Sequence, residues 1–135
     1  MFSIPTLPSR ALSSNGSKRN HHEVSAGKMR LGADAYTASH DALGPNFPHF
    51  EYVDIFITFY VKHRTRNGDG LYRPLDPSNI GGECIKPIID YGVVKPGIID
   101  DDDYKHVRWV GCHIENVSNL NEERMEVRVI EVVTE

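Results

Sequence analysis

EYVDIFITFYV, residues 51–61, is the clearest strand in this sequence. Apolar residues recur at every second position from Val53 to Val61, and most of them are β-branched or aromatic, which is typical of a sheet strand. The intervening positions include Phe56 and Tyr60, so both faces of the strand are fairly apolar. We therefore expect a central strand that is covered on both sides.

Two other segments predict helices. Residues 26–43 are rich in good helix formers, and the Gly-Pro pair that follows them is a common helix stop. A second helix is expected to begin near Ser78 and to run to about Tyr91, with a kink near Pro87.

The rest of the chain predicts two more strands. Residues 105–115 and 124–133 have strand composition, and the polar segment 116–123 predicts that they form a hairpin with a long loop. Residues 92–99 are expected to return to the sheet region. Three strand-like and two helix-like runs that do not alternate as βαβ predict an α+β domain. We expect one domain over residues 1–135, with a mixed or antiparallel sheet flanked by two helices.

The charge of the chain is unevenly distributed, although its net value is only −4. Residues 1–31 hold five Lys or Arg against one acid, and residues 1–25 have the composition of a basic loop or arm. Residues 100–103 are four consecutive aspartates. A chain that is basic at one end and locally acidic elsewhere can hold both phosphates and a divalent cation.

Several classes of protein are excluded or disfavoured by missing motifs. Cys84 and Cys112 form no CxxC pair, so we expect buried thiols in a reducing compartment and neither a Cys-rich zinc site nor a redox dithiol. GxSxG, HExxH, GxGxxG and P-loop patterns do not occur, which argues against serine hydrolases, zinc proteases and nucleotide-binding folds. No apolar run reaches membrane-spanning length and no signal-peptide core is visible, so we expect no membrane partner and a cytoplasmic location.

Carboxylates and one lysine are the residues most suited to chemistry. Glu83, Lys86 and Asp90 fall at i, i+3 and i+7 of the expected helix and so share a face. Carboxylates are the ligands that Mg²⁺ prefers, and an ammonium beside them can neutralise a pentacovalent phosphate. A simpler interpretation stays open: an aspartate run is more often a solvated loop, an Asp before proline is more often a helix cap, and a lone lysine often forms a plain salt bridge.

Several short motifs occur in a distinctive order: LPS at 7–9, SNGSKR at 14–19, DPSN at 76–79, KPIID at 86–90 and GIIDD at 97–101. In this order the chain resembles the RusA family of Holliday-junction resolvases, small dimeric endonucleases common in phages and prophages. The resemblance covers nearly the whole chain, and its specificity comes from the combination of motifs.

The resemblance implies a Mg²⁺-dependent endodeoxyribonuclease, with Mn²⁺ as a substitute, that cleaves four-way DNA junctions during recombination and repair. It implies a homodimer that binds branched DNA in the cytoplasm of a bacterial or phage-infected host cell. The catalytic residues that it implies are Asp76, Lys86 and Asp101, and the metal ligands are Asp76, Asp90, Asp100 and Asp101. Basic side chains are expected to contact phosphates: Lys18, Arg19, Lys28, Arg30, Arg64, Arg66 and Arg73.

Two departures from the family pattern leave alternatives open. Ser78 stands where the family has a second acid, and extra residues separate Asn79 from Lys86. Asn79, Glu83 or Asp90 could complete the metal shell, or Ser78 could bind a metal weakly through water. Alternatively, the chain binds branched DNA without cutting it. A third hypothesis, from another class, is a small interaction protein whose aspartates are solvated surface.

Overall fold

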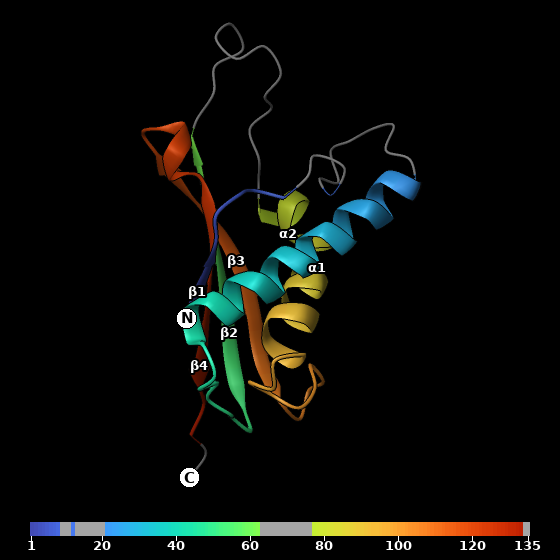
Figure 1. Cartoon of the computed structure of the whole chain (residues 1–135), viewed down its shortest axis with the longest axis vertical. Helices are drawn as coiled ribbons and strands as arrows, with labels where there is room; N and C mark the ends of the chain where they lie inside the picture. The colour runs from blue at the N-terminus through green and yellow to red at the C-terminus, as the bar shows by residue number, and fades with distance from the viewer. Residues whose placement is uncertain (9–11, 13–20, 63–76, 134–135) are drawn as a thin grey trace, which may run out of the picture.

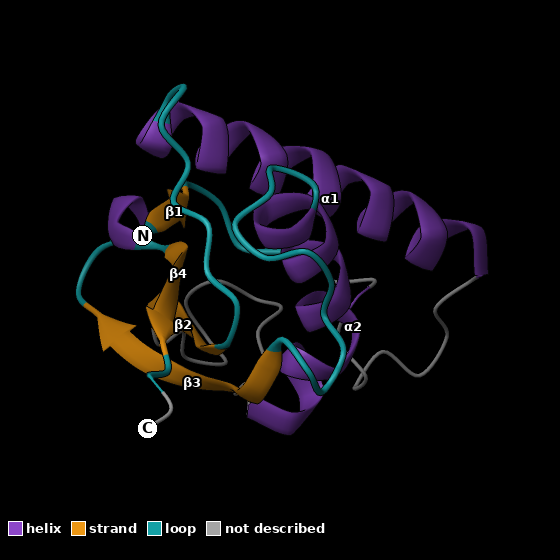
Figure 2. Ribbon diagram, turned by 90° about the horizontal axis from the view of Figure 1, so that it is seen from below, coloured by secondary structure: helices purple, strands orange, loops and turns teal. Residues whose placement is uncertain are grey.

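The computed structural model describes residues 1–8, 12, 21–62 and 77–133. They form one α+β unit in which a four-stranded mixed sheet carries its helices on one face (Figure 1). Figure 2 shows both long helices on the same side of the sheet. The expected α+β class, with a mixed sheet and two helices, is therefore confirmed.

The sheet has the strand order β1-β4-β2-β3. Its strands are β1 (Phe2–Ile4), β2 (Val53–Lys62), β3 (Val107–Val117) and β4 (Arg124–Glu131). β2 pairs with β3 in parallel and with β4 antiparallel, and β1 pairs antiparallel with β4.

β2 is central, as its sequence predicted, because one of its faces is fully apolar. Val53, Ile55, Ile57, Phe59 and Val61 point towards the helices and are buried. The alternate positions of β2 face away from the helices, and no described helix packs on that side (Figure 2). Asp54 and Thr58 on that side are nevertheless buried, and Phe56 and Tyr60 are half-buried. Both faces of β2 are therefore shielded from solvent as expected, but only one of them by helices.

Two helical segments cover the buried face of the sheet. α1 (His21–Leu43) begins earlier than the expected Ala26. α2 (Pro77–Ile89) passes through Pro87 and continues directly into a π-helical segment, η2 (Asp90–Val94).

Glycines let these segments approach closely. A Cβ atom on Gly32 of α1 would lie 2.7 Å from the ring of Tyr91, and one on Gly92 would lie 2.7 Å from the ring of Phe2. Both distances are too short for a real side chain. The two glycines therefore fix where α1 and β1 contact η2.

Two expectations about the connections are wrong. β3 and β4 are not a hairpin, because β2 lies between them and the short 3₁₀ helix η3 (Leu120–Glu122) carries the chain across. β2, α2 and β3 do form a βαβ unit, since β2 and β3 are parallel. Residues 92–99 form the end of η2 and turns, and they return to the core beside the start of β2, where the carbonyl of Ile98 accepts from the N–H of Phe50. The expected arm at 1–25 contains β1 and the start of α1.

Both cysteines are free thiols. Cys84 is buried, as expected, while Cys112 is half-buried. Burial raises the pKa of Cys84 to about 12, so this thiol stays protonated and unreactive at neutral pH. No helix in the described part of the chain is long and apolar enough to cross a membrane.

Candidate active site

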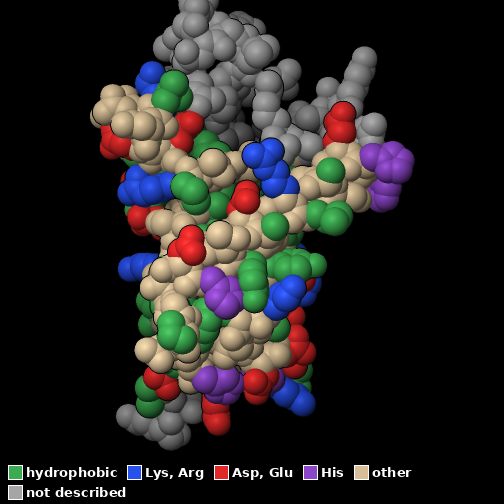
Figure 3. Space-filling model, in the orientation of Figure 1, with side chains coloured by type: hydrophobic (Ala, Val, Ile, Leu, Met, Phe, Trp, Pro, Cys, Tyr) green, Lys and Arg blue, Asp and Glu red, His purple; other side chains and the backbone are tan. Residues whose placement is uncertain are grey.

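The acidic loop, Asp100–Asp103, lies between η2 and β3 and is anchored by the two apolar residues before it. Ile98 and Ile99 are buried in the core. The N–H of Ile98 donates to the carbonyl of Val93 (3.0 Å), and the carbonyl of Ile98 accepts from the N–H of Phe50 (2.7 Å). Acidic side chains gather beside η2 at the lower right of the molecule (Figure 3). Burial of the two isoleucines thus fixes the start of the acidic loop.

Lys86 joins this loop to α2. Its ammonium donates to Oδ2 of Asp102, and its Nζ lies 3.2 Å from Oδ1 of Asp90, one helical turn further on. Because both carboxylates contact one nitrogen, they are near neighbours. Lys86 is 66% exposed and Asp102 is 24% exposed, so this lysine cluster (Lys86, Asp90 and Asp102) is accessible to solvent.

Lys86 and Asp102 each shift the pKa of the other. The Lys86 ammonium holds the pKa of Asp102 below its ordinary value of 3.8, and Asp102, together with Asp90, raises the pKa of Lys86. At neutral pH Lys86 is therefore cationic and Asp102 is anionic. The cluster combines a fixed cation with carboxylate oxygens at one exposed point.

The Lys86→Gln substitution should raise the pKa of the Asp102 carboxyl towards 3.8, because the ammonium is the largest cause of the shift. Because folding lowers the pKa of Asp102, this carboxylate stabilises the fold at pH values above its unfolded pKa. That contribution is lost as the pH falls through the folded pKa, and Lys86→Gln should reduce it. Carboxyl ¹³C NMR titration measures the shift directly. An Asp102 pKa that is the same in both proteins would contradict the contact.

The other three aspartates of the acidic loop have different partners. Oδ1 of Asp100 lies 2.9 Å from Nε2 of His49, and Oδ1 of Asp103 lies 2.6 Å from Nδ1 of His106. Oδ1 of Asp101 accepts from the N–H of Asp102 at 2.8 Å. Both histidines hold the pKa values of their aspartates below the ordinary range.

The structure brings Asp102 to Lys86, whereas the family resemblance implies Asp100 and Asp101 as the metal ligands. A run of four identical residues contains no internal signal that distinguishes one from the next. Only the path of the loop after the buried isoleucines decides which carboxylate reaches the helix. Asp90, in contrast, could be paired with Lys86 from the sequence, because residues four apart on a helix are neighbours, and the two side chains are in contact.

Several predicted site residues lie outside the described residues: Lys18, Arg19, Arg64, Arg66, Arg73 and Asp76. Ser78 lies in the first turn of α2, where only the backbone is described. Within the described ranges, no three His, Cys, Asp or Glu side chains are grouped so that they could hold a metal ion. The expected metal site, with Asp76, Asp90, Asp100 and Asp101 as ligands, therefore stays a prediction.

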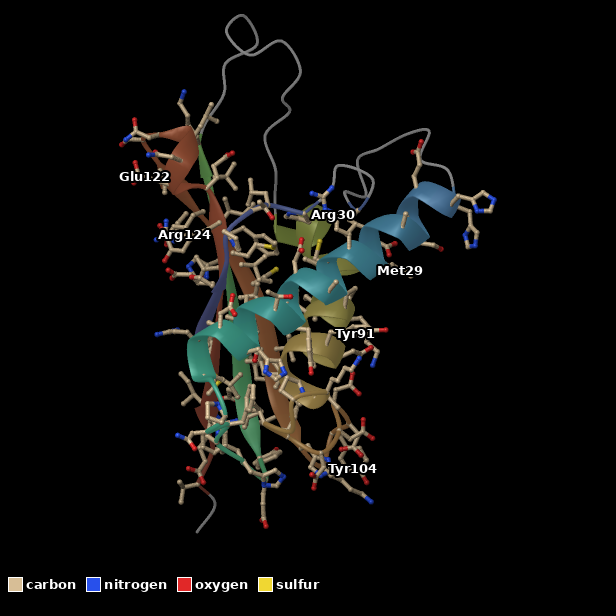
Figure 4. The ribbon with its side chains drawn as sticks, viewed as in Figure 1. Met29, Arg30, Tyr91, Tyr104, Glu122 and Arg124 are labelled. Carbon is tan, nitrogen blue, oxygen red and sulfur yellow. The ribbon has the colours of Figure 1, made fainter. Side chains whose placement is uncertain are left out.

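Of the predicted DNA contacts, Lys28 and Arg30 are described and both are exposed on α1. Nζ of Lys28 lies 2.8 Å from Oε2 of Glu83, which ties α1 to α2. In Figure 4, Arg30 lies at the upper end of the helical layer and Tyr104, next to the acidic loop, lies at the lower end.

In comparisons with known proteins, no family model and no curated protein matches this chain. Fold and geometry together define a small α+β protein with an exposed cluster of one lysine and two carboxylates beside an acidic loop.

Proposed function

We propose that this protein is a metal-dependent endodeoxyribonuclease that cleaves four-way DNA junctions. The observation that supports the proposal is the contact of Lys86 with Asp90 and Asp102, from two separate segments. A lysine between carboxylates at an exposed site suits chemistry on a phosphodiester. The resemblance to RusA resolvases supplies the substrate class.

Asp90 and Asp102 have the ligand chemistry of a hard divalent cation such as Mg²⁺ or Mn²⁺, because they offer carboxylate oxygens and neither residue belongs to the buried core. A full set of ligands requires Asp76, which lies outside the described residues. We propose that Asp76, Asp101 and Asp102 hold the ion, with Asp90 and Asp100 in support. A bound ion would polarise the scissile phosphate and activate a water.

Lys86 has a separate role in this proposal. Its ammonium is charged at neutral pH, and Asp102 raises its pKa further, so it can neutralise charge that develops on the scissile phosphate. Asp90 holds the lysine side chain from its own helix at 3.2 Å. Basic residues of the N-terminal segment and of residues 62–75 are proposed to bind the DNA phosphates, and the host cytoplasm is the proposed location.

Ser78 favours a second candidate function. A neutral hydroxyl in place of a carboxylate lowers the negative charge of the proposed metal site and weakens its hold on a divalent cation. The protein would then bind branched DNA without cleaving it.

A nicking assay distinguishes these functions. The purified full chain is incubated with a labelled synthetic four-way junction, or with linear duplex of the same sequence, in Mg²⁺, Mn²⁺ or EDTA. Metal-dependent nicking of the junction alone supports the nuclease. Junction binding without nicking in either metal supports the binding protein, and neither binding nor nicking overturns both.

Ser78→Asp should increase the rate of Mg²⁺-dependent nicking, or lower the Mg²⁺ concentration required for half-maximal rate, by roughly tenfold, because it adds a carboxylate to the proposed site. Ser78→Asn is the matched control, since it changes size and polarity without adding charge. Equal Mg²⁺ dependence in Ser78→Asp and Ser78→Asn would show that position 78 does not contact the metal.

A four-way junction has two symmetric scissile strands, so the proposed function requires two active sites related by a two-fold axis. We therefore propose a homodimer.

A further inference from the structure

One face of the sheet carries no helix in the described chain. This open face is formed by alternate residues of the three longest strands, which pair across the sheet in register. They are Phe56, Thr58 and Tyr60 on β2, Trp109, His113 and Glu115 on β3, and Arg124, Glu126 and Arg128 on β4. Near the β3–β4 connection the open face is hollowed by about 560 Å³. Figure 4 shows Glu122 and Arg124 on the opposite side of the sheet from Tyr91.

An aromatic row crosses the open face. The ring of Trp109 packs on Phe56 with centroids 4.9 Å apart, and the guanidinium of Arg128 lies 5.4 Å from the Phe56 centroid on the next strand. A Cβ atom on Gly111 would lie 1.9 Å from Cη2 of Trp109, so the indole ring lies against the backbone of β3. Trp109 is nevertheless 49% exposed.

This composition is that of a protein interface. Tryptophan, tyrosine and arginine are the residues most enriched among interface hot spots. Besides the aromatic row, the guanidinium of Arg124 lies 3.9 Å from the centroid of Tyr60. Large aromatic side chains that are already held in place lose little conformational entropy when a partner covers them.

The charges of the open face identify the partner. Arg124 and Arg128 are balanced by Glu115 and Glu126, and Arg124 already pairs with Glu126 at 3.2 Å. A surface for a polyanion would be basic, so this balance disfavours DNA. In an isologous dimer, a face that carries both signs can place the arginines of one copy opposite the glutamates of the other.

We propose that the open face is the interface between two copies of this chain. The choice of a second copy over another protein rests on the proposed function, which requires a two-fold pair of sites. β2 has ten residues and is about 33 Å long, and the three strands of the open face span about 14 Å, so the face covers roughly 460 Å² per copy. Two such faces together have the size of a weak or transient interface, which makes the dimer dependent on concentration. Both lysine clusters would remain exposed on the outer, helical layers.

The single tryptophan gives a test in the unmodified protein, because Trp109 is the only one in the chain. Light scattering at tens of micromolar should give twice the chain mass of 15.2 kDa. On dilution, the Trp109 emission should shift to the red over the same concentration range in which the mass falls to that of one chain. A monomer at all concentrations overturns the proposal, and so does a dimer whose dissociation leaves the emission unchanged.

Variants locate the interface. Trp109→Ala and Arg128→Glu should each raise the dimer dissociation constant at least about 30-fold, as hot-spot substitutions do. Arg30→Glu makes the same charge change on α1 and should leave the oligomeric state unchanged. Arg128→Glu mixed with Glu115→Arg should recover a mixed dimer, which a misfolded variant could not form. Dimers that persist in both face variants, or an Arg30→Glu effect of equal size, would place the contact elsewhere.

The tests of this interface and the tests of the nuclease proposal can fail independently. A dimer that binds no junction and cuts none would retain this interface and reject the function. A monomer that nicks junctions in Mg²⁺ would retain the function and reject this interface.

Discussion

Asp102→Asn should lower the rate of metal-dependent junction nicking at least about 100-fold and leave junction affinity unchanged or slightly higher. The substitution removes the carboxylate that contacts Lys86, together with one of the proposed metal-binding charges. It also removes a negative charge near the DNA phosphates, so binding has no reason to weaken. Single-turnover nicking and a gel-shift titration on the same junction measure the two effects separately.

Two neighbouring variants make this result interpretable. Asp103→Asn is the matched control, because Asp103 pairs with His106 on the same loop, and its rate should stay within about threefold of the unmodified protein. Asp101→Asn tests the ligand that the family pattern implied. If Asp101→Asn abolishes nicking while Asp102→Asn does not, Asp101 is the essential carboxylate and the contact with Lys86 is a surface salt bridge.

Phe59→Ala should reduce the free energy of unfolding by about 3–5 kcal/mol, since it removes a fully buried ring from the centre of the core. A loss of this size is a large fraction of the stability of a small domain. Urea denaturation followed by far-UV circular dichroism measures it.

Phe56→Ala is the natural comparison, because the same residue type is removed from the same strand on the opposite face. At concentrations where the chain is monomeric, its cost should be much smaller than that of Phe59→Ala, and its main effect should be on self-association. Equal losses for the two variants would mean that the open face is as well packed as the helical face.

Features determined by local sequence were predictable. The alternation in residues 51–61 identified β2 as a central strand, because period two with β-branched and aromatic residues is typical of a sheet strand. The Gly-Pro pair after Leu43 marked the end of α1. The i, i+4 spacing of Lys86 and Asp90 predicted a contact on one helix, and the two side chains meet.

Features that depend on distant pairing were not predictable. β3 and β4 follow each other in sequence, but they do not pair with each other. The more apolar β2 lies between them, because a central strand is shielded from solvent by a neighbour on each edge. The three residues of β1 are too few for a periodic signal, and only pairing with β4 makes them a strand. The selection of Asp102 from four aspartates likewise depends on tertiary contacts.

The position of β2 in the sheet has a consequence during protein synthesis. Val53 pairs with Val107, which is made 54 residues later, and with Glu131 near the end of β4. At 5–20 residues per second, β2 waits roughly 3–10 s for its first neighbour. Throughout that interval the nascent chain presents its most aggregation-prone segment without a strand to pair with. The sheet can close only after β4 has been made, so chaperone protection of this segment is most useful in the seconds before β3 emerges.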